Sequence, residues 1–161
     1  TLTATDHAYL AAMRKLGLKD VMLSFVERPE DVAELRELLP DANLVLKIES
    51  RRGLDFVRTH GNTYGRLMAA RGDLYVEVLQ PHRIVGATRD IVRADPDAIV
   101  ASRVLASLAA DPVPTCSDIS DVALSLSLGY RTFMLGDEVC LRRDSVIPAL
   151  NLLAEIAKAE N

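Results

Sequence analysis

The chain has 161 residues and a formal net charge of −4, with 26% charged and 49% apolar residues. This composition is too apolar for a disordered segment, and 23 acidic against 19 basic residues argue against nucleic acid or a membrane as a partner. No apolar run approaches the ~18 residues that span a bilayer, and the opening TLTATDHAYL lacks the basic and apolar regions of a signal peptide. Cys116 and Cys140 lack metal-ligand spacing and are too few for a disulfide framework, so we expect a cytoplasmic protein.

Short apolar runs alternate with longer amphipathic segments along the chain. The short runs predict strands buried on both faces, and the amphipathic segments predict helices. In chain order we expect a helix over 5–16 that ends at Gly17, a strand over 21–26, a helix over 29–39, strands over 44–48 and 67–70, a helix over 81–93, a strand over 98–101, a helix over 116–128 capped by Thr115, a strand over 132–135 and a helix over 146–159.

This α/β alternation predicts a parallel sheet with right-handed crossovers. Two architectures fit it: a five-stranded doubly wound sheet, or the latter part of a (β/α)8 barrel, which needs about 250 residues in full. The length of the chain favours the doubly wound sheet, and the pattern of elements leaves both open.

Polar side chains follow the predicted strands at their carboxyl ends, where both architectures place their sites. Lys47 and Glu49 are two residues apart and should project to the same side, and Asp73 follows the next strand, ~4.8 Å away. Two carboxylates suit Mg²⁺, a neighbouring lysine suits an oxyanion or phosphoryl group, and Gly72 lets backbone N–H groups approach an anion. The alternative is that these are solvated loop residues, which any one of them alone would favour.

The remaining candidate ligands have structural explanations. His7, His60 and His82 share no metal-ligand spacing, and we expect solvated side chains. Cys116 and Cys140 are predicted to be small buried apolar residues.

Ordered motifs decide between the architectures. The chain contains, in order, LSFVERPEDV, LVLKIES, LMAARGDLYVE, ASRVLASL, DPVPTCSDISDVALSLSLG and TFMLGDE. These resemble the pyruvate kinase patterns SFVR-x-x-DV, KIEN, ARGDLGVE, ATQMLESM, P-x-PTRAE-x-SDVANA and MLSGET. The resemblance implies an α/β fold of the TIM (β/α)8 barrel type found in the phosphoenolpyruvate/pyruvate class, of which this chain supplies about five βα units as a single, incomplete barrel domain over 1–161.

The resemblance also implies roles for matching residues. Lys47 and Ser102 match catalytic positions, the serine replacing a family threonine, and Glu49 and Asp73 match the two protein ligands of Mg²⁺ or Mn²⁺. The substrate-binding positions are Ala70, Arg71, Gly72, Asp73, Ser102 and Ser24. The family also uses potassium, whose expected ligands have no counterpart in this chain.

Several residues depart from the family patterns. Ser50 replaces the asparagine of KIEN, Tyr75 the glycine after ARGDL, and Arg103 the glutamine of ATQ. The SGET segment has become Gly136-Asp137-Glu138-Val139. These changes put ordinary substrate geometry in question.

The resemblance implies a glycolytic phosphotransferase that transfers a phosphoryl group between phosphoenolpyruvate and ADP, giving pyruvate and ATP. Nothing in the chain resembles the first three barrel strands, the capping domain or the C-terminal regulatory domain, so we expect this chain alone to be inactive. It begins with Thr1, and we expect it to be part of a longer chain or to associate with another copy, because an incomplete barrel leaves two open edges. Two alternatives stay open: a Mg-dependent lyase acting on another small 2-oxo acid, and a non-catalytic interaction module.

Overall fold

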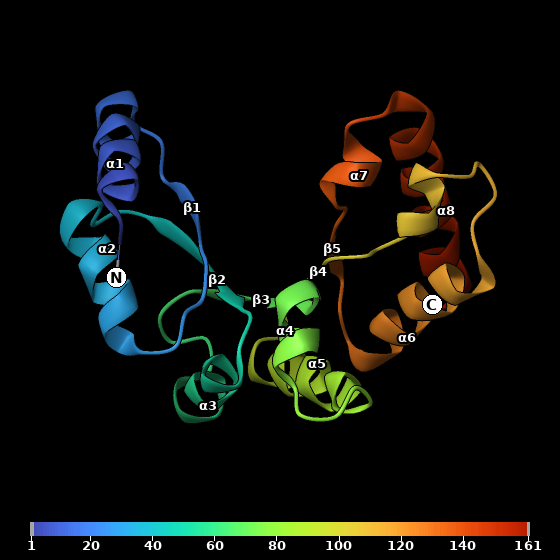
Figure 1. Cartoon of the computed structure of the whole chain (residues 1–161), viewed down its shortest axis with the longest axis horizontal. Helices are drawn as coiled ribbons and strands as arrows, with labels where there is room; N and C mark the ends of the chain where they lie inside the picture. Colours follow the sequence, from blue (N-terminus) through green and yellow to red (C-terminus); the bar gives the residue numbers. More distant parts are fainter. Residues whose placement is uncertain (1, 161) are drawn as a thin grey trace.

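A computed structural model describes residues 2–160 and contains a five-stranded parallel sheet (Figure 1). The strands follow one another in space in the order of the sequence, β1 (Asp20–Leu23), β2 (Asn43–Ile48), β3 (Arg66–Ala70), β4 (Ile99–Ala101) and β5 (Thr132–Met134). A doubly wound sheet reverses its strand order part-way, whereas the wall of a barrel does not. The length-based preference for a doubly wound sheet is therefore wrong, and the fold is an α/β partial (β/α) barrel.

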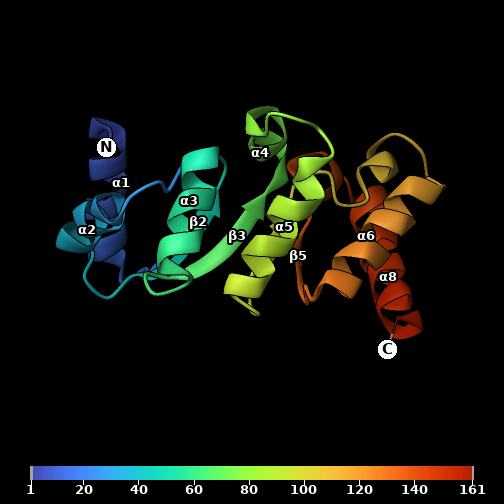
Figure 2. The same ribbon diagram turned by 90° about the horizontal axis from the view of Figure 1, so that it is seen from below.

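The helices follow the outer side of the curved sheet, from α1 and α2 beside β1 to α6 and α8 beside β5 (Figures 1 and 2). Their bounds are α1 (Ala4–Leu16), α2 (Pro29–Leu38), α3 (Arg51–His60), α4 (Arg71–Glu77), α5 (Arg83–Ala94), α6 (Cys116–Leu128), α7 (Asp137–Cys140) and α8 (Arg143–Ala159), with a 3-10 turn η1 (Ala106–Ala109). No helix within residues 2–160 is both long and apolar enough to cross a membrane.

Helix ends confirm several of the predicted boundaries. Gly17 follows α1 with a left-handed φ of 71°, and Gly129 follows α6 with a φ of 117°. Thr115 caps α6 by accepting a hydrogen bond from the backbone N–H of Asp118. By contrast, α3 and α4 were not predicted, and α8 begins three residues before the predicted start at 146.

The two faces of the sheet have different surroundings. Leu46, Leu67 and Val100 face the helices and belong to the main core, where they are fully buried. On the opposite face, Lys47 is in register with Met68, and Met68 is in register with Ile99. This second face carries a smaller apolar cluster and places Lys47 at its carboxyl end. The sheet thereby directs Lys47 away from the main core and toward the expected site.

Two predictions about individual side chains need correction. Cys116 and Cys140 are exposed rather than buried, because both lie at the ends of helices on the surface. His60 is half-buried, with its ring centroid 5.0 Å from Phe56, so it packs against an aromatic neighbour rather than being solvated. His7 and His82 are exposed, as predicted.

Candidate functional site

Three of the predicted site residues lie together at the carboxyl ends of β1 and β2. The Lys47 Nζ atom is 2.9 Å from Glu49 Oε1 and donates to Ser24 Oγ at 3.1 Å. The Glu49 side chain is 3% exposed, whereas that of Lys47 is 24% exposed. A buried carboxylate requires a partner of opposite charge, and Lys47 provides it. Lys47 and Glu49 do project to the same side of the strand end.

Glu49 has a second partner that the sequence did not indicate. The backbone N–H of Phe25 donates to Glu49 Oε2 at 2.8 Å. Phe25 has a φ of 51°, a left-handed conformation that non-glycine residues seldom adopt. Strained backbone of this kind concentrates at functional sites, where the surrounding structure maintains it. The turn after β1 therefore fixes the orientation of the Glu49 carboxylate.

A further contact anchors this turn to the start of α3. Ser50, the N-cap of α3, donates to Glu27 Oε1 at 2.6 Å and accepts from the N–H of Gly53 at 3.1 Å. The N–H of Val26 in the same turn donates to the carbonyl oxygen of Lys47 at 3.3 Å. Ser50 thus joins the turn that carries Phe25 to the strand that carries Lys47 and Glu49.

The second group of predicted site residues follows β3 and β4. Ala70 ends β3, and Arg71 begins α4 without any intervening loop. A Cβ atom added at Gly72 would lie 3.4 Å from Ser102 Oγ and 3.6 Å from Ser102 Cβ, which are ordinary van der Waals distances, so Gly72 and Ser102 are neighbours. Ser102 itself has a φ of 71°. The structure therefore brings Gly72 and Ser102 together at the ends of neighbouring strands.

Asp73 shares none of the contacts that Glu49 makes. It is exposed in the first turn of α4, and its side chain forms no hydrogen bond or ion pair with any part of the chain that the structure describes. Ile48 and Ala69 are in register, so Glu49 and the start of α4 leave adjacent strands at the same edge of the sheet. The predicted set thus forms two groups, Ser24–Lys47–Glu49 and 70–73 with Ser102.

Comparison with known proteins identifies the family of this chain. Residues 1–141 match the family model described as pyruvate kinase, barrel domain. The chain belongs to the pyruvate kinase family. A pyruvate kinase of Agrobacterium vitis is 38% identical over 142 residues, which cover 85% of this chain and 29% of that protein.

Other pyruvate kinases match nearly the whole chain. That of Methylorubrum extorquens is 32% identical over 162 residues, covering 98% of this chain and 34% of that protein. Pyruvate kinase 2 of Saccharomyces cerevisiae is 31% identical over 163 residues, covering 97% and 32% respectively. The chain therefore spans about a third of the length of these relatives.

Two departures from the pyruvate kinase patterns contact each other. The Arg103 guanidinium lies over the ring of Tyr75, 5.7 Å from its centroid, which is within the range of a cation–π contact. Arg103 has a φ of 59° and follows Ser102 directly. The two substitutions therefore form one contact between α4 and the turn after β4.

Glu49 and Asp73 carry carboxylate oxygens, the kind of ligand that Mg²⁺ takes in proteins. Within residues 2–160, no group of three or more His, Cys, Asp and Glu side chains could hold a metal ion. Mg²⁺ nevertheless needs only one or two protein carboxylates, because water and substrate oxygens complete its octahedron. Glu49 Oε2 accepts one hydrogen bond, from the N–H of Phe25, and Glu49 Oε1 forms an ion pair with Lys47, whereas the Asp73 carboxylate is unengaged within the described residues.

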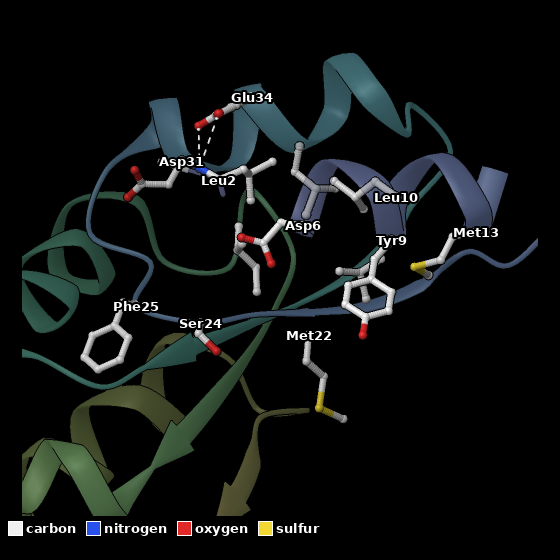
Figure 3. A pocket seen from close by; sticks show the side chains of 13 residues that line it. Leu2, Asp6, Tyr9, Leu10, Met13, Met22, Ser24, Phe25, Asp31 and Glu34 are labelled. Carbon is white, nitrogen blue, oxygen red and sulfur yellow. Dashed lines mark hydrogen bonds between the residues drawn. The ribbon is translucent and has the colours of Figure 1, made fainter. Parts of the chain in front are cut away.

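A separate hollow of about 410 Å³ lies between α1, α2 and β1 and is lined by Asp6, Asp31 and Glu34 (Figure 3). All three accept hydrogen bonds from backbone N–H groups near the starts of α1 and α2. Partial burial opposes the ionisation of Asp31, but the N–H groups of Glu27 and Arg28 and the Arg28 guanidinium hold its pKa below the ordinary value. These carboxylates stabilise helix starts, so their burial is explained without a ligand.

Proposed function

We propose that this chain supplies the enolate half of a pyruvate kinase active site, which transfers a phosphoryl group between phosphoenolpyruvate and ADP. The observation that carries the proposal is the contact of Lys47 with the buried Glu49 at the end of β2, beside the turn that begins α4. The ion pair lies at the carboxyl ends of the strands, which is where the catalytic groups of (β/α)8 barrels are found. Membership of the pyruvate kinase family supports the choice of reaction.

In this proposal the site residues contact different parts of the substrate. The Lys47 ammonium, already directed away from the core by the sheet, neutralises the negative charge that develops on the enolate and phosphoryl oxygens. The backbone N–H groups of the 70–73 turn bind the substrate carboxylate, and Gly72 in that turn lies beside Ser102. Ser102 presents a hydroxyl beside the same turn and Ser24 holds Lys47 in place.

Glu49 and Asp73 hold the divalent cation in the same proposal. Such an ion, when bound, supplies positive charge to the substrate oxygens and fixes their orientation. The Phe25 N–H and Lys47 constrain the Glu49 carboxylate before any ligand arrives, so little reorganisation is required on binding. The nucleotide, the potassium ion and the parts of the pyruvate kinase that would bind them are proposed to belong to the intact protein.

The test is calorimetric titration of oxalate, an enolpyruvate mimic, in the presence and absence of Mn²⁺. We expect metal-dependent binding to the wild-type chain, and a loss of about 10- to 100-fold or more in affinity for Glu49→Gln and for Asp73→Asn, because each removes a negatively charged ligand. Asp55→Asn is the matched control, since Asp55 is an exposed carboxylate on α3 paired with Arg58.

Three results would contradict the proposal. Oxalate binding that does not depend on the metal would remove the role of Glu49 and Asp73. Equal affinities for all variants would show that the site lies elsewhere. Absence of binding to a folded wild-type chain would favour a non-catalytic interaction module.

A further inference from the structure

The Arg71 side chain connects the start of α4 to the end of β4. Its Nε atom donates to the carbonyl oxygen of Ala101 at 3.2 Å, and its Nη2 atom donates to that of Ser102 at 2.9 Å. The side chain is only 14% exposed. A guanidinium offers five donors in a rigid plane, so contacts with two successive carbonyl groups fix the backbone that carries them.

Asp121, on α6, holds this guanidinium from the other side. Its Oδ1 atom is 2.6 Å from Arg71 Nη1, and its Oδ2 atom accepts from Arg71 Nη2 at 2.8 Å. Two parallel hydrogen bonds between a guanidinium and a carboxylate specify geometry as well as charge. Asp121 therefore determines where the Arg71 plane lies between the two strand ends.

The backbone that Arg71 contacts is strained. Ser102, Arg103 and Leu105 all have positive φ values, of 71°, 59° and 53°. Such conformations persist only where the surrounding structure maintains them. The contacts from Arg71 to Ala101 and Ser102 hold the first part of this segment, next to Gly72.

We infer that Asp121 is a positioning residue for the site, which acts through Arg71 to hold Ser102 and the 70–73 turn in their mutual geometry. This inference rests on the proposed function, because it assigns Asp121 to the part of the site that binds the substrate carboxylate. Asp121 does not itself touch the substrate. A purely structural salt bridge would contribute to stability without a selective effect on one ligand.

The contrast between two ligands separates the two roles. In the proposed site the metal is held by the Glu49 and Asp73 side chains, whereas oxalate also depends on the 70–73 backbone and Ser102. Asp121→Asn keeps the size of the side chain and removes its charge. We expect it to lower oxalate affinity in the presence of Mn²⁺ by about 10- to 100-fold, as seen when supporting residues are changed. Mn²⁺ affinity without oxalate should fall by a smaller factor, because Asp73 lies in the 70–73 turn but Glu49 does not.

The matched control is Asp90→Asn. Asp90 forms an ion pair across two helices, with its Oδ2 atom 3.7 Å from Arg58 Nη2, and its side chain is 45% exposed. We expect wild-type affinities for this variant. Amide hydrogen exchange of the same three proteins gives an independent measurement: exchange in 70–73 and 102–105 should rise about tenfold in Asp121→Asn alone, because local opening becomes easier.

Each outcome decides the inference. Wild-type oxalate affinity in Asp121→Asn would overturn it, as would equal losses of oxalate and Mn²⁺ affinity, which indicate a general structural effect. If the wild-type chain binds no oxalate, the proposed function fails, and hydrogen exchange alone then tests whether Asp121 positions the 70–73 turn and Ser102 through Arg71. Faster exchange of 70–73 and 102–105 in Asp121→Asn alone would then support the positioning role of Asp121. Exchange at the wild-type rate in this variant would overturn that role.

Discussion

Tyr130 is a buried phenol at the junction of α6 and β5, with no exposed surface. Its hydroxyl donates to the carbonyl oxygen of Thr88 at 2.7 Å, and burial raises the pKa of the phenol well above its ordinary value of 10. Because the folded state keeps the proton, the stabilisation from Tyr130 is complete below pH 10 and is lost as the pH rises above it.

We therefore expect Tyr130→Phe to have two effects. At pH 8 it should lower the free energy of unfolding by about 1–2 kcal/mol, because the carbonyl of Thr88 loses its donor. Between pH 9 and 11 the free energy of unfolding of Tyr130→Phe should fall less steeply with pH than that of the wild type. Urea unfolding at several pH values measures both effects, with Tyr9→Phe as control because Tyr9 is 67% exposed. Parallel pH curves would contradict the assignment.

The predictability of single residues depended on whether their role follows from strand alternation. Lys47 and Glu49 could be placed on one side of β2 because side chains alternate along a strand. The contact of Glu49 with Phe25 could not be predicted from the sequence, because it uses a backbone N–H in a left-handed turn. Asp121 lies 50 residues from Arg71 in the chain, and its only signal was its place in the SDV motif.

At the scale of elements, two helical glycines differ in their surroundings. A Cβ atom at Gly53 in α3 would lie 3.0 Å from the carbonyl oxygen of Val26 and 3.2 Å from Ile48 Cγ2, whereas one at Gly86 in α5 would meet nothing within 4 Å. Alanine is favoured over glycine in a helix by about 0.8–1 kcal/mol. We expect Gly86→Ala to stabilise the chain by roughly that amount.

Gly53→Ala should have the opposite sign. The added methyl group would displace the turn that carries Val26, and the cost of such overpacking is about 1–3 kcal/mol, which exceeds the gain in helix propensity. Urea unfolding of both variants against the wild type measures the difference. Equal stabilisation by the two substitutions would show that α3 does not press against the turn after β1.

Element boundaries were least predictable where a helix begins with polar residues. The segment RRGLDFVRTH of α3 opens with two arginines and a glycine, which conceal the helical spacing of Leu54 and Val57. α8 begins at Arg143, but its apolar stripe starts only at Val146. β1 stops at Leu23 rather than at 26, because Phe25 leaves the extended conformation to reach Glu49.

At the scale of the whole molecule, the choice between barrel and doubly wound sheet could not be made from the lengths of apolar runs. Both architectures use the same βα units and differ in the spatial order of the strands, which short runs do not encode. Family motifs decided it, and the observed order β1 to β5 agrees. Within residues 2–160 the two outer strands, β1 and β5, each pair along one edge alone.

The open edge at β1 predicts self-association of the isolated chain. Met22 is 53% exposed in this strand and shares a sheet face with Val45, opposite the main core. Unpaired strand edges with apolar side chains recruit further strands, and a lysine there opposes such pairing. We expect the wild-type mass in sedimentation equilibrium to rise with concentration, and Met22→Lys to reduce that rise by about tenfold in association constant, equivalent to ~1.4 kcal/mol.

Leu141→Lys is the control for this prediction, because Leu141 is 83% exposed and lies outside the sheet, between α7 and α8. If general surface hydrophobicity drives association, both lysine substitutions will weaken it equally. If the β1 edge drives it, only Met22→Lys will do so, because only that lysine lies where another strand would pair. A wild-type chain that stays monomeric at all concentrations would show that this edge is protected within the chain itself.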